Sequence, residues 1–129
     1  MRVLVVDDEP LVRDLEQLVL SGAGYEVLTA SGGRAALSLV DDVPVDLVIA
    51  DFKMPEMDGD EMARQLRVLY PDLKILFVTG HADNLFLSQP VLWEDEAYLD
   101  KPFTSAGLLE AVSMLLSGHV APVRAGGMS

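Results

Sequence analysis

The chain has 129 residues, the length of one domain, because globular domains commonly contain roughly 100–200 residues. Half of the residues are hydrophobic, so the chain can bury a core, and 21 acidic against 9 basic residues give a net charge of −12. This charge argues against direct binding to nucleic acid or to anionic membranes. Because the chain has no cysteine, disulfides, cysteine-ligated zinc and thiol catalysis are excluded.

The amino terminus carries a short apolar run, residues 3–6, directly before Asp7 and Asp8. This run is too short for a signal peptide, and no later stretch reaches the roughly 18 apolar residues that a membrane-spanning helix needs. We therefore expect a cytoplasmic protein that does not contact membranes.

Short apolar runs alternate with stretches of helical spacing along the whole chain, the pattern of buried strands and amphipathic helices. The predicted strands are residues 3–6, 25–29, 47–50, 75–78 and 97–99. The predicted helices follow them at residues 10–22, 33–40, 58–69, 83–89 and 104–117. The fourth helix has the weakest pattern, because Pro90 would end it.

The first and last of these helices each carry apolar residues spaced as one stripe. In the first helix the stripe is Leu11, Val12, Leu15, Leu18 and Val19. In the last it is Leu108, Leu109, Val112, Leu115 and Leu116. The predicted end signals are Gly22 and Gly24 for the first helix, Gly118 for the last, and Thr104 or Ser105 as the last helix's N-cap. Asp58 and Glu61 resemble a capping box for the third helix.

Strands that are apolar on both faces and joined by helices predict an α/β fold with a parallel sheet covered on both sides. We expect residues 1–117 to form this domain. Residues 118–129 are rich in Gly, Ala and Pro and are expected to form a flexible tail, in which His119 has no assigned role.

Polar residues collect where the predicted strands end, and parallel strands end at one edge of the sheet. They are Asp7, Asp8, Asp51, Thr79, Asp100 and Lys101. Three carboxylates held close together repel by roughly 4 kcal/mol per pair at about 4 Å, so either one retains a proton or a hard divalent cation lies among them. Oxygen ligands without His or Cys favour Mg²⁺, or Mn²⁺, and a carboxylate beside such a metal and a lysine is a competent nucleophile toward phosphorus.

Four blocks of the sequence resemble the signature of the response-regulator receiver domain of two-component signalling. They are residues 5–10 (VVDDEP), 51–59 (DFKMPEMDG), 78–80 (VTG) and 101–103 (KPF). The similarity extends over about residues 1–117. It implies the flavodoxin-like receiver fold, a doubly wound five-stranded parallel sheet of strand order 2-1-3-4-5 flanked by five helices.

The resemblance also implies a phosphoacceptor site. Asp51 would accept a phosphoryl group from a phosphohistidine of a sensor histidine kinase or of a phosphotransfer protein. Asp8 and Asp51 would bind Mg²⁺ directly, with the backbone carbonyl of Lys53 as a further ligand, and Asp7 would act mainly through water.

The same resemblance implies a switch around the phosphoryl group. Lys101 would pair with the phosphoryl oxygens, Thr79 would move toward them, and Tyr98 would turn inward as Thr79 moves. The bond between Lys101 and Pro102 would be cis, which proline tolerates. The side chains that would limit water access to the phosphorylated residue, and so set its lifetime, are Lys53 and His81.

The resulting hypothesis is a phosphorylation-activated signalling switch, not an enzyme, that assists its own phosphorylation and dephosphorylation. Its output would be contact with an unknown downstream protein or onward phosphotransfer. The resemblance leaves partner identity and dimerisation open, because residues 93–96 (WEDE) stand where relatives usually have a Gly-Ala turn.

Three alternatives remain open. The chain could be a receiver domain excised from a hybrid histidine kinase. A Mg²⁺-dependent phosphohydrolase of the haloacid-dehalogenase type would need Asp-x-Asp after the first strand, which Asp7-Asp8-Glu9 does not supply. A receiver-like scaffold that works without phosphorylation is disfavoured, because the acidic pair, Asp51, Thr79 and Lys101 are all present.

Overall fold

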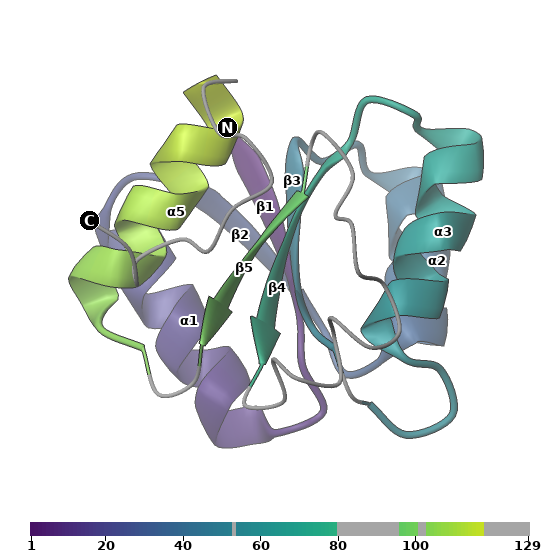
Figure 1. The fold of residues 1–129 in the computed structure, drawn as a ribbon, viewed down its shortest axis with the longest axis horizontal. Helices are drawn as coiled ribbons and strands as arrows, with labels where there is room; N and C mark the ends of the chain where they lie inside the picture. The colour runs from purple at the N-terminus through teal and green to yellow at the C-terminus, as the bar shows by residue number, and fades with distance from the viewer. Residues whose placement is uncertain (53, 80–95, 101–102, 118–129) are drawn as a thin grey trace.

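The computed structural model describes residues 1–52, 54–79, 96–100 and 103–117 (Figure 1). Its elements are β1 (Arg2–Val6), α1 (Pro10–Gly22), β2 (Glu26–Ala30), α2 (Gly33–Asp42), β3 (Leu47–Asp51), α3 (Gly59–Leu69), β4 (Lys74–Thr79), β5 (Glu96–Asp100) and α5 (Ser105–Ser117). All five predicted strands are confirmed, with ends that differ from the prediction by one residue at most. The predicted helix at residues 83–89 and the predicted tail lie outside the described residues. Among the described helices, none has the length and apolar character that crossing a membrane requires.

The five strands form one parallel sheet, as the sequence pattern predicted, in the order β2-β1-β3-β4-β5 that the resemblance implied. Figure 1 shows α1 and α5 on one face of this sheet and α2 and α3 on the other. Strand β2 lies on one side of β1, and strands β3, β4 and β5 follow one another on the other side of β1. The strand order therefore reverses between β1 and β3, where ligands commonly bind in doubly wound sheets.

The core has two halves, because alternate residues of each strand face opposite sides of the sheet. Leu4, Val48 and Ile75 belong to the half beneath α2 and α3. Val3, Leu47 and Leu76 belong to the half beneath α1 and α5. In the first half the rings of Phe52 and Phe77 meet edge to face, with centroids 5.7 Å apart. The strands of the sheet are therefore packed on both faces.

The apolar stripe predicted for α1 meets the core only in part, through Val19. Leu11, Leu15 and Leu18 are 85%, 48% and 72% exposed, whereas the residues of α1 that are buried are Glu16 and Leu20. The prediction was wrong for the three leucines. Helix α1 begins at Pro10 after a connection of only three residues from β1, and so short a connection limits which side of the helix can face the sheet. The stripe of α5 is buried as predicted, at Leu108, Val112 and Leu115.

The helix ends follow the predictions in part. Thr104 caps α5, because its hydroxyl oxygen accepts the backbone N–H of Gly107 at 2.9 Å. The capping box of α3 is wrong: Asp58 is the N-cap residue, but its side chain makes no capping hydrogen bond. Its backbone carbonyl instead accepts the N–H of Met62 at 3.0 Å. After α1, Gly24 has a φ of 97°, the left-handed conformation that favours glycine.

Candidate functional site

Asp7, the first residue after β1, is held by hydrogen bonds to residues of β2, of α1 and of the connection between β1 and α1. Asp7 donates its N–H to the carbonyl of Ala30 at 3.2 Å, and its carboxylate accepts the N–H of Glu9 at 2.9 Å. Its own carbonyl accepts a hydrogen bond from Nη1 of Arg13 at 2.7 Å. The side chain is 1% exposed. These contacts fix an acidic residue in place at the carboxyl end of β1.

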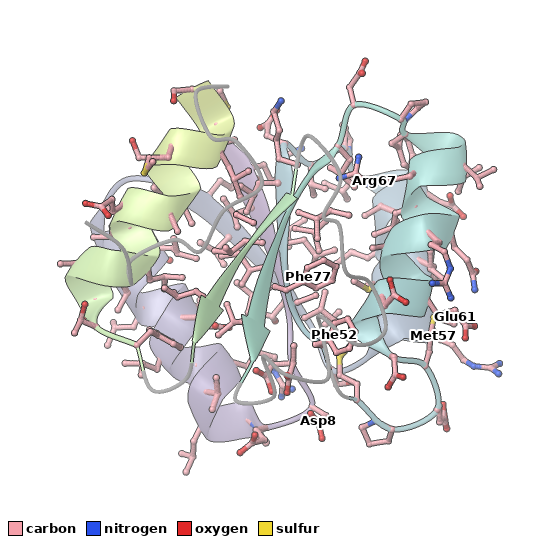
Figure 2. All side chains as sticks on the ribbon, viewed as in Figure 1. Asp8, Phe52, Met57, Glu61, Arg67 and Phe77 are labelled. Atoms are coloured by element: carbon pink, nitrogen blue, oxygen red, sulfur yellow. The ribbon has the colours of Figure 1, made fainter. Side chains whose placement is uncertain are left out.

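Three carboxylates meet at this edge of the sheet. One carboxylate oxygen each from Asp7, Asp8 and Asp51 lies within 4.8 Å of the others, although Asp51 is more than 40 positions away in the sequence. Asp51 is the last residue of β3 and is only 6% exposed, whereas Asp8 is exposed. Figure 2 places Asp8 beyond the ends of the strands. The structure thus brings together the three acids that the sequence singled out.

The acidic cluster, Asp7, Asp8 and Asp51, has the donor chemistry of a site for a hard cation. Two oxygens that ligate one ion at roughly 2.0–2.6 Å each can be up to about 5 Å apart, so the observed spacing accommodates an ion. At this spacing and an effective dielectric of about 20, each pair of carboxylates repels by roughly 3–4 kcal/mol, which a cation would offset. The residues present therefore fit a divalent metal ion held by oxygen ligands.

The start of α3 packs directly on the backbone of Asp51. The N–H of Gly59 donates to the carbonyl of Phe52 at 2.9 Å, and a Cβ atom on residue 59 would overlap the backbone oxygen of Asp51. Only glycine allows this approach. The sequence marked Asp58 and Gly59 as a helix start but not as a support for Asp51, because this contact depends on tertiary packing.

A cleft of about 290 Å³ lies beside the acidic cluster, at its Asp8 side. Its other lining residues come from the loop before α2 and the first turn of that helix, and from the loop before α3: Ser31, Gly32, Gly33, Arg34, Ala35, Pro55, Glu56 and Met57. Arg34 and Glu56 form an exposed ion pair, with 3.9 Å between Nε and Oε2. Glu56 has a φ of 68°, an uncommon conformation for a residue with a side chain. The cleft leaves the exposed side of the cluster open to solvent.

Of the other predicted site residues, the structure describes the backbone of two, Thr79 and Tyr98. Thr79 is the last residue of β4, one position beyond Val78, the residue paired with Asp51. Tyr98 lies in β5, paired with Phe77. The structure describes the backbone of Thr79 and Tyr98 but not their side chains, so their assigned roles stay predictions. The predicted site residues that lie outside the described residues are Lys53, His81, Lys101 and Pro102.

One residue that contacts the site was missed in the sequence. Arg13 lies in α1 and has no role in the sequence-based prediction, yet its guanidinium reaches back to the carbonyl of Asp7. A basic residue one turn into the helix that follows an acidic pair is the signal that could have identified it.

Comparison with known proteins identifies a family. Residues 3–113 match the family described as the response regulator receiver domain. The chain is 34% identical over 115 residues to the response regulator receiver protein CpdR of Brucella abortus, covering 89% of this chain and 96% of CpdR. It is 37% identical over 116 residues to the sensor kinase CckA of Brucella abortus, covering 88% of this chain but only 12% of that kinase.

Solved structures give the same result. The crystal structure of a response regulator receiver protein from Sinorhizobium medicae superposes with a TM-score of 0.82 at 33% sequence identity, covering 93% of this chain and 97% of the other. Similarity therefore extends to complete receiver proteins and to receiver segments within longer kinases.

Proposed function

Because the chain belongs to the response regulator receiver domain family, and is thus a phosphorylation-activated signalling switch, we propose that Asp51 is its phosphoacceptor. The observation that carries this proposal is the position of Asp51, buried at the end of β3 with its carboxylate among those of Asp7 and Asp8. An oxygen of Asp51 would attack the phosphorus of a phosphohistidine. As the new P–O bond forms, the P–N bond breaks and the imidazole leaves with the electron pair and takes up a proton.

The acidic cluster would hold Mg²⁺, or Mn²⁺ in its place, together with the backbone carbonyl of Lys53. When bound, the ion would supply positive charge to the oxygens of the transferring phosphoryl group. Asp7 is held rigidly and buried, so its carboxylate would orient the site, whereas the exposed Asp8 is reachable from solvent. Asp51 would act both as a metal ligand and as the nucleophile.

The response to phosphorylation would involve four further residues. Lys101 would pair with the phosphoryl oxygens, Thr79 would move toward them, Tyr98 would follow, and the peptide bond before Pro102 would be cis. Phosphorylation can act only through contacts that differ between the two states of the protein. The side chains proposed to set the lifetime of the phosphoryl group are Lys53 and His81.

The exposed leucines of α1, namely Leu11, Leu15 and Leu18, support contact with the phosphodonor protein. They lie on the helix that begins directly after Asp7 and Asp8, so a partner that covers them would also reach the acidic cluster. We place a sensor histidine kinase or a histidine phosphotransfer protein on this surface. The signal would leave through contact with a further protein or through onward phosphotransfer.

The boundaries of this unit also belong to the proposal. Residues 1–117 would form the receiver domain and residues 118–129 a tail. The unit would be a regulatory phosphoacceptor and not an enzyme that turns over a separate substrate. The same proposal holds if the chain is a receiver domain of a longer hybrid kinase, since it matches a segment of CckA.

Phosphorylation by a small donor tests the acceptor directly. The protein is incubated with acetyl phosphate and Mg²⁺, and intact mass is measured for the wild type, Asp51→Asn and the surface control Asp72→Asn. We expect the wild type and the control to gain one phosphoryl group, and Asp51→Asn to gain none. Removing Mg²⁺ with a chelator should abolish the gain.

Two outcomes would contradict the proposal. Metal-dependent phosphorylation that survives in Asp51→Asn would place the acceptor elsewhere. Sustained turnover of a generic phosphomonoester such as p-nitrophenyl phosphate would instead support the phosphohydrolase.

A further inference from the structure

Arg13 makes the contact that could control the geometry of the acidic cluster. Its Nη1 donates a hydrogen bond of 2.7 Å to the backbone carbonyl of Asp7, and the contact is partly buried. We propose that Arg13 is a positioning residue, which orients the peptide unit between Asp7 and Asp8 and thereby sets the metal affinity of the cluster. This inference rests on the metal site of the proposed function.

The geometry assigns this role through the planarity of the peptide bond. The carbonyl of Asp7 and the N–H of Asp8 belong to one rigid plane. A hydrogen-bond donor that holds this carbonyl therefore fixes the orientation of the whole peptide unit, and with it the position of the Cα atom of Asp8. Two further hydrogen bonds of Asp7 hold its N–H and its carboxylate, and neither group belongs to the peptide unit between Asp7 and Asp8.

Asp8 depends on such support more than its neighbours do. Asp7 and Asp51 are buried among packed residues, whereas Asp8 is exposed. An exposed carboxylate has several accessible rotamers, so its backbone orientation decides whether it points toward the other two acids. Arg13 supplies that orientation from the first turns of α1.

The charge of Arg13 would have the opposite effect on metal binding. A guanidinium near the cluster repels a divalent cation, so loss of its charge alone would strengthen metal binding. Loss of its positioning contact would weaken metal binding. The sign of the change in Mg²⁺ affinity therefore separates the two roles.

The test is calorimetric titration of Mg²⁺ into the full chain for the wild type, Arg13→Met and Arg13→Lys. Methionine keeps an apolar stem but has no donor, so we expect affinity to fall by about tenfold, the loss typical of residues that orient metal ligands. Lysine keeps a donor on a long side chain and should restore most of the affinity. Arg2→Met is the matched control, because Arg2 also donates to a backbone carbonyl, that of Pro44 at 2.9 Å, but lies at the end of β1 opposite the acidic cluster.

Unfolding in urea without Mg²⁺, measured on the same variants, separates positioning from general destabilisation. A purely structural role would lower the free energy of unfolding and leave the Mg²⁺ affinity of the folded protein unchanged. If Arg13→Met does not fold, Arg13→Gln replaces it, since its amide ends short of the carbonyl of Asp7 and its affinity must also fall.

The outcomes are distinct from those of the acceptor experiment. Unchanged or increased Mg²⁺ affinity in Arg13→Met, with the wild type binding Mg²⁺, would overturn the role of Arg13 alone. A wild type that binds no Mg²⁺ would overturn both this inference and the metal site on which it rests.

Discussion

Helices α1 and α5 lie on the same face of the sheet, and each carries three apolar residues with the same spacing, yet only α5 buries all three against the sheet. In α1 the residues are Leu11, Leu15 and Leu18; in α5 they are Leu108, Val112 and Leu115. The α5 residues are buried, whereas those of α1 are largely exposed. Apolar spacing thus identifies a helix but does not decide which of its sides meets the core.

The difference arises where each helix begins. The connection into α1 is anchored by the hydrogen bonds of Asp7, and Pro10 then starts the helix. The side of α1 that faces the sheet carries Glu16 and Leu20, because the connection places them there. Helix α5 begins with the cap of Thr104, and its leucine stripe coincides with the side that faces the sheet.

The largest expected effect is on stability, and it should distinguish the two stripes. Leu108→Ala removes a fully buried side chain and should lower the free energy of unfolding by about 2–5 kcal/mol. Leu11→Ala, at an exposed position of the other stripe, should change it by less than about 0.5 kcal/mol. Urea denaturation measures both, and equal losses would show that the leucines of α1 are buried as the sequence predicted.

The second prediction concerns what the exposed stripe is for. Replacing Leu11, Leu15 and Leu18 together by serine should leave phosphorylation by acetyl phosphate unchanged. Transfer from a histidine kinase that phosphorylates the wild type should slow by about tenfold or more, since apolar anchors contribute at least about 1.4 kcal/mol in many interfaces.

Radiolabelled phosphotransfer assays measure this rate. Val68→Ser, which changes an exposed apolar residue of α3, serves as the control. An undiminished rate of transfer to the triple variant would place the donor protein elsewhere.

The smallest effect tests the start of α5. Thr104→Ala removes the hydroxyl that caps the N–H of Gly107 and should cost about 1 kcal/mol of unfolding free energy. Ser105→Ala, one residue further on, should cost far less, because Ser105 already lies within the helix. Thermal or urea unfolding distinguishes them, and a larger loss in Ser105→Ala would move the cap to that residue.

Much of the fold could be predicted because its strands are short apolar runs with clear ends. Residues 47–50 and 75–78 are apolar throughout, as strands buried on both faces must be, and both lie in the centre of the sheet. The facing side of α1 could not be predicted, since it depends on the connection and not on the composition of the helix. The predicted capping box of α3 was wrong, because the presence of Asp58 and Glu61 does not ensure that the side chain of Asp58 points toward a free N–H of the helix.

The acidic cluster could be predicted in outline, because Asp7, Asp8 and Asp51 each follow a strand of one parallel sheet. The supports of the cluster could not. The approach of Gly59 to the backbone of Asp51 and the reach of Arg13 to Asp7 are tertiary contacts between segments that no local pattern relates.

The length of the three-residue connection between β1 and α1 limits which side chains of α1 can be exposed. Adding or removing one residue there would rotate every side chain of α1 by about 100° around the helix axis. The leucines would leave the solvent, and Arg13 would leave the carbonyl of Asp7 in the same step. The proposed partner surface and the geometry of the acidic cluster are therefore linked through the length of this connection, and we expect an insertion at this point to alter both together.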